Sequence, residues 1–260
     1  MKKNNAVTAL VSMNTRCFIG TSGWDYPHWR HLFYPDELKQ LHWLSWYAVR
    51  FNSVEINSTF YRLPSESTVQ RWRDSVPEGF RISLKAPRTI THYKKLKDAG
   101  KQVKRFYRIS SILGDKCGAH LFQLPASFCF DAENSRILAQ FVTQLDPGRD
   151  NVIEFRNEGW WNSDCFELLR GHRVCFCAVD GFGMPELVPP YADIAYFRFH
   201  GSAYDGDYPE VVLGRYARII ENLDCSRIYG YFNNDVEARA VFNARTLAGM
   251  LGRQAGHYRA

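Results

Sequence analysis

The chain has 260 residues and a mass of 30.2 kDa, a length that fits one large α/β domain or two small ones. Hydrophobic residues make up 45% and charged residues 23%, as in globular proteins, and no apolar run approaches the length of a membrane span. We therefore expect no membrane partner. The net charge of +6 permits an anionic partner without requiring one.

The seven cysteines form no CxxC pair, and most lie in apolar, strand-like runs. An odd number of cysteines in such runs favours reduced, buried thiols and a cytoplasmic location over a disulfide framework. We expect Cys175 and Cys177 to share the outer, helix-facing side of one strand. Residues 1–15 contain no sustained apolar segment of the kind found in signal peptides, and are predicted to be a flexible tail before a single domain at residues 16–255.

Eight predicted strands alternate with helical segments along the chain. The strands are Arg16–Gly20, Ser53–Asn57, Phe80–Lys85, Ala119–Gln123, Asn151–Arg156, Val174–Asp180, Ile194–His200 and Arg227–Asn233. The helices are Asp36–Val49, Glu66–Asp74, Gly100–Leu113, Ala132–Leu145, Ser163–Arg170, Glu210–Leu223 and Val236–Leu251. This order predicts an α/β protein with one (β/α)₈ TIM barrel. An open doubly wound sheet also alternates, but the GxGxxG fingerprint of its dinucleotide-binding version is absent.

Charged side chains occupy one face of two of these strands. Glu154 and Arg156 alternate with the apolar Phe155, and Arg198 and His200 oppose flanking phenylalanines. Successive side chains of a strand point to opposite faces, so the charged groups are expected to point into the barrel near its carboxyl end, where TIM-barrel enzymes carry out their chemistry. The same reasoning places further polar groups at the upper interior: Glu55, Asn57, Lys85, Gln123, Asp180, Asn233 and Asn234.

These residues favour acid–base chemistry such as isomerisation, elimination or hydrolysis. Glu154 is the first candidate for the base, with His200 or Lys85 as the acid; a lysine of depressed pKa also forms Schiff bases. Further catalytic candidates are Glu55 and Asp180. The arginines suit a carboxylate or phosphate group. The predicted substrate-binding residues are Arg156, Arg198, Asn57, Gln123, Asn233, Asn234, Tyr61 and Trp24. Covalent catalysis by serine or cysteine has no supporting motif.

Other interpretations of the same residues remain open. The three acids and three bases of the interior are also consistent with a self-paired structural ion network. A divalent metal held by Glu55, Glu154, Asp180 and His200 is disfavoured because cations lie between these ligands and no HExxH or HxH motif is present, so no cofactor is expected.

The basic segment Arg88–Lys97 follows the third strand and is expected at the same end of the barrel. Its arginine, lysines, histidine and tyrosine are residue types that contact phosphates, although an ordinary solvated loop has the same composition. Three functions follow: an enzyme for a small anionic or sugar-phosphate-like substrate, a nucleic-acid or phosphate-binding protein without turnover, and a structural or adaptor barrel. The sequence does not specify the oligomeric state.

Seven motifs occur in order: Ile19–Trp24, Ser53–Tyr61, Lys85–Pro87, Gln123–Pro125, Glu154–Arg156, Arg198–Gly201 and Tyr231–Asn234. Together they resemble the YecE-like family, a domain of unknown function, from about Phe18 to Leu251. The resemblance implies a TIM barrel without an established reaction, distantly similar to sugar-phosphate isomerase and endonuclease IV-type barrels, which use metals. This chain has one histidine at a predicted strand end instead of their His-rich sets, so carrying over zinc or nuclease activity rests on fold analogy alone.

Overall fold

The computed structural model describes residues 15–186, 188–190, 193–201 and 206–252. The predicted flexible tail lies outside this part of the chain except for Thr15. The described residues form nine strands: β1 Arg16–Thr21, β2 Ser53–Ile56, β3 Arg81–Lys85, β4 Cys117–Gln123, β5 Asn151–Glu154, β6 Val174–Phe176, β7 Ala178–Asp180, β8 Ile194–Phe199 and β9 Arg227–Phe232. The helices are α1 Trp43–Ala48, α2 Glu66–Asp74, α3 Gly100–Ser110, α4 Ala132–Val142, α5 Ser163–Gly171, α6 Glu210–Glu221 and α7 Arg239–Met250.

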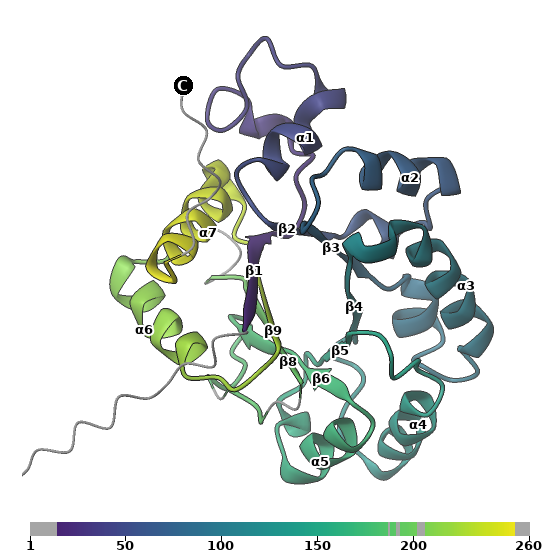
Figure 1. Ribbon diagram of the computed structural model, residues 1–260. Coiled ribbons are helices and arrows are strands. Elements are labelled where there is room, and N and C mark those ends of the chain that lie inside the picture. The colour runs from purple at the N-terminus through teal and green to yellow at the C-terminus, as the bar shows by residue number, and fades with distance from the viewer. Residues whose placement is uncertain (1–14, 187, 191–192, 202–205, 253–260) are drawn as a thin grey trace, which may run out of the picture.

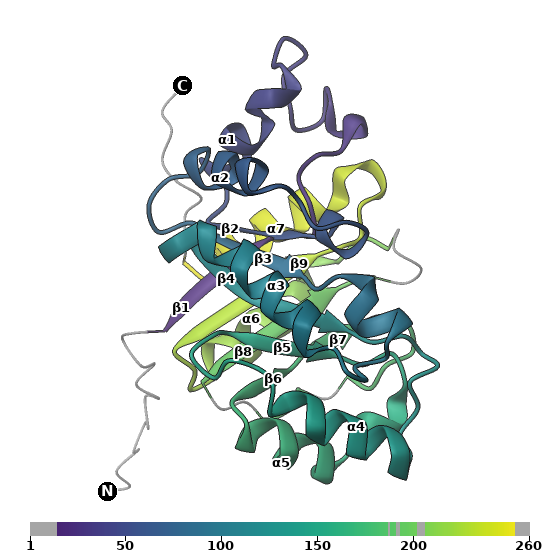
Figure 2. The ribbon, with the colours of Figure 1, turned by 90° about the vertical axis from the view of Figure 1, so that its right-hand side faces the viewer.

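The strands form two parallel sheets in a mixed α/β fold. One sheet has the order β1-β9-β8-β7 and the other β2-β3-β4-β5-β6, and every pairing is parallel. Figure 1 shows the strands around a common centre with the helices outside them, and Figure 2 shows the same layers from the side. Parallel pairing places the carboxyl ends of neighbouring strands together, which brings residues far apart in the sequence to one end of the fold.

The two sheets approach each other at two places. The predicted strand Val174–Asp180 is interrupted at Cys177, so that β6 pairs with β5 while β7 pairs with β8. On the other side, a single bridge joins Ser22 to Glu55, just beyond β1 and within β2. Strand pairing therefore runs through each sheet, with one register shift between β3 and β4 at Ile82 to Leu84, and is interrupted between the sheets.

Side-chain caps explain the starts of three of the seven α-helices in the described residues. The side chains of Ser65, Asp131 and Asn162 accept hydrogen bonds from backbone N–H groups three residues on, which caps α2, α4 and α5. The predicted helix Asp36–Val49 is wrong in its first half. Its chain instead makes turns with i→i+3 bonds, such as that from the Leu38 N–H to the Pro35 carbonyl, and α1 begins only at Trp43.

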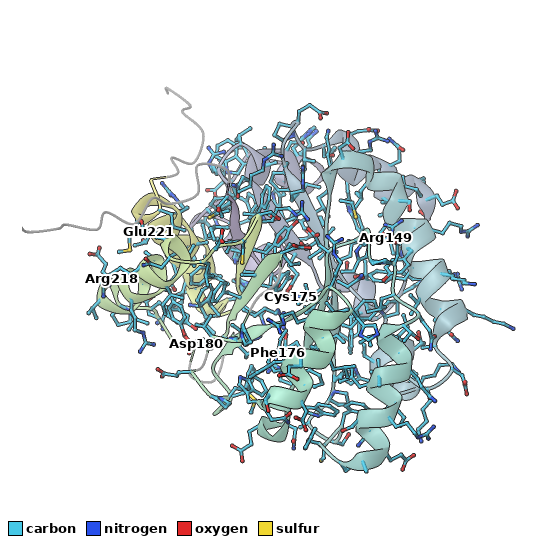
Figure 3. The ribbon with its side chains drawn as sticks, turned by 60° about the horizontal axis from the view of Figure 1, so that its bottom comes forward. Arg149, Cys175, Phe176, Asp180, Arg218 and Glu221 are labelled. Atoms are coloured by element: carbon cyan, nitrogen blue, oxygen red, sulfur yellow. The ribbon has the colours of Figure 1, made fainter. Side chains whose placement is uncertain are left out.

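The core has two parts. The larger part fills the space between strands and helices. The smaller part consists of strand residues and Cys177, between β6 and β7, and fills the interior; its strand residues are Phe18, Ala119, Leu121, Val152, Cys175, Val179, Ile194, Tyr196, Tyr229 and Tyr231. Cys175 and Cys177 thus face the interior rather than the helices, whereas Phe176 packs with the outer core; Figure 3 labels Cys175 and Phe176 on this strand. All seven cysteines are free.

No helix in the described part of the chain is long and apolar enough to cross a membrane.

At Gly20, β1 lies so close to β2 that there is no room for a side chain. A Cβ added at this position would lie 2.0 Å from the Ser53 carbonyl oxygen and 2.7 Å from the Tyr47 hydroxyl. Gly20→Ala is therefore expected to lower the free energy of unfolding by about 2 kcal/mol, as overpacking does in cores. Gly214→Ala in α6 is the matched control, since nothing lies within 4 Å of the added Cβ and alanine favours helix. Equal urea midpoints for the two variants would contradict the expected crowding.

Candidate active site

A cavity of about 1230 Å³ opens at the carboxyl ends of β2, β3, β4, β5, β8 and β9. Predicted site residues that line it are Trp24, Asn57, Tyr61, Lys85, Gln123, Arg156, Arg198 and Asn233. Glu55, Glu154 and His200 are buried and contact arginines of this wall. The alternation of side chains along the strands therefore brings together most of the residues that the sequence singled out.

Arg198 is the centre of a buried ion network beneath the cavity. One terminal nitrogen of its guanidinium donates to Glu154 Oε2 at 2.7 Å, and the other donates to Glu55 Oε1 at 2.8 Å. Glu55 also accepts bonds from Ser22 Oγ and Tyr196 Oη, both at 2.6 Å. Each carboxylate is thus compensated by a guanidinium donor, which is what a buried charge requires.

Arg156 extends this network toward the cavity. Its Nε donates to Glu154 Oε1, and one terminal nitrogen lies 3.2 Å from His200 Nε2. Its guanidinium carbon lies 3.9 Å from the centre of the Phe182 ring, a cation–π contact at the cavity wall. Arg156 therefore joins the buried carboxylates to the cavity.

The network fixes the protonation of its members. Burial alone raises the pKa of Glu154, but the guanidinium groups of Arg156 and Arg198 outweigh it and hold this pKa well below its usual range. Burial, followed by the positive charge of Arg198, places the pKa of His200 well below its usual range. At neutral pH, Glu154 is therefore a weakly basic carboxylate and His200 is a neutral imidazole.

The tautomer of His200 follows from its neighbours. A guanidinium only donates hydrogen bonds, so His200 Nε2 accepts from Arg156 and the ring proton is on Nδ1. Asn233 lies 3.0 Å from Nδ1, and its amide must present the oxygen there, which a half-turn of the amide group provides. In this arrangement His200 has no proton on Nε2 to give to a ligand.

Lys85 differs from the arginines because it is outside the ion network. In the described chain no carboxylate lies within 4.0 Å of its Nζ, which instead lies 4.4 Å from the centre of the Phe60 ring. Burial, together with the charge of Arg198, lowers the pKa of Lys85 to about 8. Lys85 is consequently the cation of the wall that exchanges a proton most readily near neutral pH.

Two predicted residues face away from the cavity. Asp180 lies next to the outer-core residues Tyr208 and Tyr216, and its charge helps to raise the pKa of both hydroxyls after burial itself. The alternation that points Val179 inward directs Asp180 outward, and Figure 3 shows its position on β7. Asn234 donates to Asn243 in α7 at 2.7 Å and to the Gly206 carbonyl at 3.0 Å, so it ties β9 to its surroundings.

The cavity also has lining residues that the sequence did not single out. They include the cation Arg71, the imidazole of His92 and the rings of Tyr26, Phe60, Trp72 and Phe182. His92 lies in the predicted basic loop, whose position after β3 was a usable signal. Arg71 and Trp72 lie on α2. The periodicity of a helix in the sequence distinguishes core positions from surface positions, but it does not identify surface positions that line a cavity.

The electrostatics favour an anionic ligand. Among the described lining residues, Arg71, Lys85, Arg156 and Arg198 are cationic and Asp25 is acidic; Glu154 and Glu55 already compensate Arg156 and Arg198, which leaves Arg71 and Lys85. In the described residues no group of three or more histidine, cysteine or acidic side chains is placed to hold a metal ion. The two buried glutamates are already bound by guanidinium groups, and Asp180 faces outward, so the four ligands considered from the sequence do not converge.

Comparisons with known proteins agree with this architecture. The family described as "Protein of unknown function DUF72" matches residues 18–259. UPF0759 protein YecE of Escherichia coli (strain K12) is 36% identical over 111 residues, which are 43% of this chain and 38% of YecE. The match to YecE thus spans about two-fifths of that protein's length. UPF0759 protein YunF of Bacillus subtilis (strain 168) is 25% identical over 206 residues, covering 73% of this chain and 71% of YunF.

Solved structures show the same fold. A DUF72 family protein from Thermotoga maritima superimposes with a TM-score of 0.80 at 29% identity, covering 92% of this chain and all of that one. A DUF72 family protein from Enterococcus faecalis V583 gives a TM-score of 0.78 at 18% identity, covering 95% of this chain and 99% of its own, which supports the fold alone. From its sequence, its fold and the family match over nearly its whole length, the chain belongs to the DUF72 (YecE-like) family.

Proposed function

We propose that the protein is an enzyme that acts on a small anionic, sugar-phosphate-like substrate in the cavity at the carboxyl ends of the strands. The observation that carries this proposal is the presence of two cations in the wall, Arg71 and Lys85, that have no carboxylate within 4.0 Å in the described chain. Cations without a protein counter-ion are available to a ligand, whereas a purely structural network uses up its charges.

The roles follow from the contacts. Lys85 is the group that transfers a proton, because its pKa of about 8 lies near the working pH. Glu154, the first candidate for the base, has both oxygens bound by arginines and instead orients Arg156 and Arg198. Arg71 and Arg156 hold the anion. The amides of Asn57 and Gln123 orient the rest of the substrate, and the Asn57 Oδ1, which is buried without a partner in the described structure, is available as an acceptor.

We also infer a (β/α)₈ barrel, in which the two sheets are continuous around the interior through the Ser22–Glu55 bridge and the strand interrupted at Cys177. A site at the carboxyl ends of the strands is the position that TIM-barrel enzymes use. The seven free cysteines support a cytoplasmic location, where thiols stay reduced.

The proposal is tested by thermal unfolding in the presence of inorganic phosphate, glycerol 3-phosphate and glucose 6-phosphate, with glycerol and glucose as neutral counterparts. A ligand that binds only the folded state raises the midpoint according to its concentration over Kd. We expect Arg71→Gln to weaken binding of the phosphorylated ligand about three- to tenfold, which corresponds to the net contribution of one hydrogen bond, about 0.7–1.4 kcal/mol.

Arg73→Gln is the matched control. Arg73 is on the same helix and is also exposed, but it donates to the Ile112 carbonyl and does not line the cavity. Equal effects of the two substitutions, or no midpoint shift with any of these anions, would contradict the proposed site.

A second candidate function is binding of nucleic acid without turnover. Arg88 lies 5.9 Å from the centre of the Tyr61 ring and 5.3 Å from that of Tyr93, and both tyrosines are about two-thirds exposed. Exposed rings beside an arginine resemble the stacking platforms that bind single strands. In the same thermal experiment, a single-stranded oligonucleotide that raises the midpoint at low salt, while the small phosphates do not, would favour this function.

A further inference from the structure

The surroundings of the Lys85 amine are those of a nucleophile rather than of a structural cation. Lys85 ends β3 and its amine lies at the cavity wall, above the face of Phe60 and away from the carboxylates of the ion network. Arg156 and Arg198, in contrast, bind Glu154 directly. A lysine that served to neutralise the buried charges would form an ion pair with one of those carboxylates, and in the described structure Lys85 forms none.

A histidine packs against the same aromatic ring as this amine. His92 lines the same cavity, its ring centre is 4.9 Å from that of Phe60, and after burial the charge of Lys85 is what lowers its pKa. Its Nδ1 is 2.9 Å from Thr91 Oγ1, which fixes the ring. Lys85 and His92 therefore contact the same Phe60 ring, with the imidazole unprotonated at neutral pH.

We propose that Lys85 forms an imine with an aldehyde or ketone that carries an anionic group; this names the substrate class of the enzyme proposed above and rests on that proposal. The neutral amine adds to the carbonyl carbon and gives a carbinolamine. His92 takes the proton from the nitrogen and returns a proton to the departing hydroxyl, so that one water leaves and the carbon–nitrogen double bond remains. No oxidant or reductant takes part.

The anionic group is assigned to the arginines of the wall. Arg71 and Arg156 line the cavity together with Lys85, and in the described chain the second terminal nitrogen of Arg156 has no protein acceptor. A phosphate or carboxylate held there leaves the carbonyl end of a short ligand for the amine. The imine adjacent to these positive charges would acidify the neighbouring C–H bonds, which is the use that enzymes make of lysine imines.

The experiment is reductive trapping. The protein is incubated with glycolaldehyde phosphate and sodium cyanoborohydride, which reduces an imine to a stable secondary amine, and the modified peptides are mapped by mass spectrometry. A pKa of about 8 leaves the amine of Lys85 neutral about 300-fold more often at pH 7 than that of an ordinary lysine. We expect Lys85 to be labelled tens to hundreds of times faster than the exposed Lys101 and Lys104 of α3, and glycerol 3-phosphate to slow this labelling by competition.

Two variants serve as controls. Lys85→Arg retains the charge but forms no imine, and Lys85→Met removes both the charge and the amine. In each variant we expect the fast adduct to be lost, while Lys101 and Lys104 are labelled as in the wild type. Uniform labelling of all lysines, or a fast adduct elsewhere in the variants, would overturn the proposal. A midpoint shift with glycerol 3-phosphate but no fast adduct at Lys85 would overturn the imine and leave the anion site standing. Absence of both would overturn the two together.

Discussion

Replacing Arg198 with methionine is expected to lower the free energy of unfolding by about 3–5 kcal/mol at pH 7. Arg198 is 1% exposed and donates to both Glu55 and Glu154, so its removal leaves two buried carboxylates without their shared counter-ion. In a chain of this size each kcal/mol corresponds to roughly 2–4 °C in the thermal midpoint. Urea unfolding followed by circular dichroism measures the loss.

The pH dependence identifies the cause. The pKa of Glu154 is depressed in the folded wild-type protein, so its ion pairs contribute stability above the unfolded pKa and lose it as the pH falls through the folded pKa. In Arg198→Met the pair between Arg156 and Glu154 remains, but Glu55 has lost its guanidinium partner, and burial disfavours its charged form. The difference in the free energy of unfolding between Arg198→Met and the wild type should be largest at pH 7 and should decrease toward pH 5.

The matched controls are carboxamide variants. In Arg198→Met combined with Glu55→Gln and Glu154→Gln, the buried carboxylate charges are gone and only Arg156, which lines the cavity, loses its carboxylate partner, so part of the lost stability should return. If the triple variant is as unstable as Arg198→Met alone, the loss comes from packing around the long side chain and the electrostatic interpretation is wrong.

The sequence located the ion network because the opposite faces of its strands are unambiguous. Val54 and Ile56 flank Glu55, and Phe197 and Phe199 flank Arg198, so the alternation of strands determines which side chains point inward. Val174–Asp180 has apolar residues on both faces, and there the same rule assigned Cys175, Cys177 and Asp180 to the wrong sides.

Other features depend on contacts that no sequence pattern contains. Asn233 lines the cavity whereas Asn234, one residue later, points toward α7, and each asparagine alone is consistent with either position. Lys85 has no carboxylate partner in the described structure because Arg156 and Arg198 bind the nearby carboxylates of Glu154 and Glu55. Which ions pair is decided by side-chain geometry across several strands, whereas the composition gives only the numbers of acidic and basic residues.

Removing the Lys85 charge is expected to stabilise the protein, even though it abolishes the proposed chemistry. A pKa displaced from 10.5 to about 8 means that holding the ammonium form in the folded state costs about 3 kcal/mol at neutral pH. Lys85→Met fills a similar volume without a charge, so the free energy of unfolding should rise by up to that amount at pH 7. Thermal and urea unfolding measure it, and active sites commonly carry such a cost.

The sign of the pH effect separates this explanation from better packing. Because the unfolded chain binds more protons at Lys85 than the folded protein between about pH 8 and 10.5, wild-type stability should rise with pH over that window. The gain in the free energy of unfolding from Lys85→Met should therefore be largest below pH 8 and should decrease as the pH approaches 10.5.

Lys101→Met, on the exposed face of α3, is the control and should change the free energy of unfolding little at pH 7 or pH 10.5. An advantage for Lys85→Met that is the same at pH 7 and pH 10.5 would point to packing. A loss of stability at pH 7 would mean that the ammonium group is compensated in the folded protein, and Lys85 would then be a poor nucleophile.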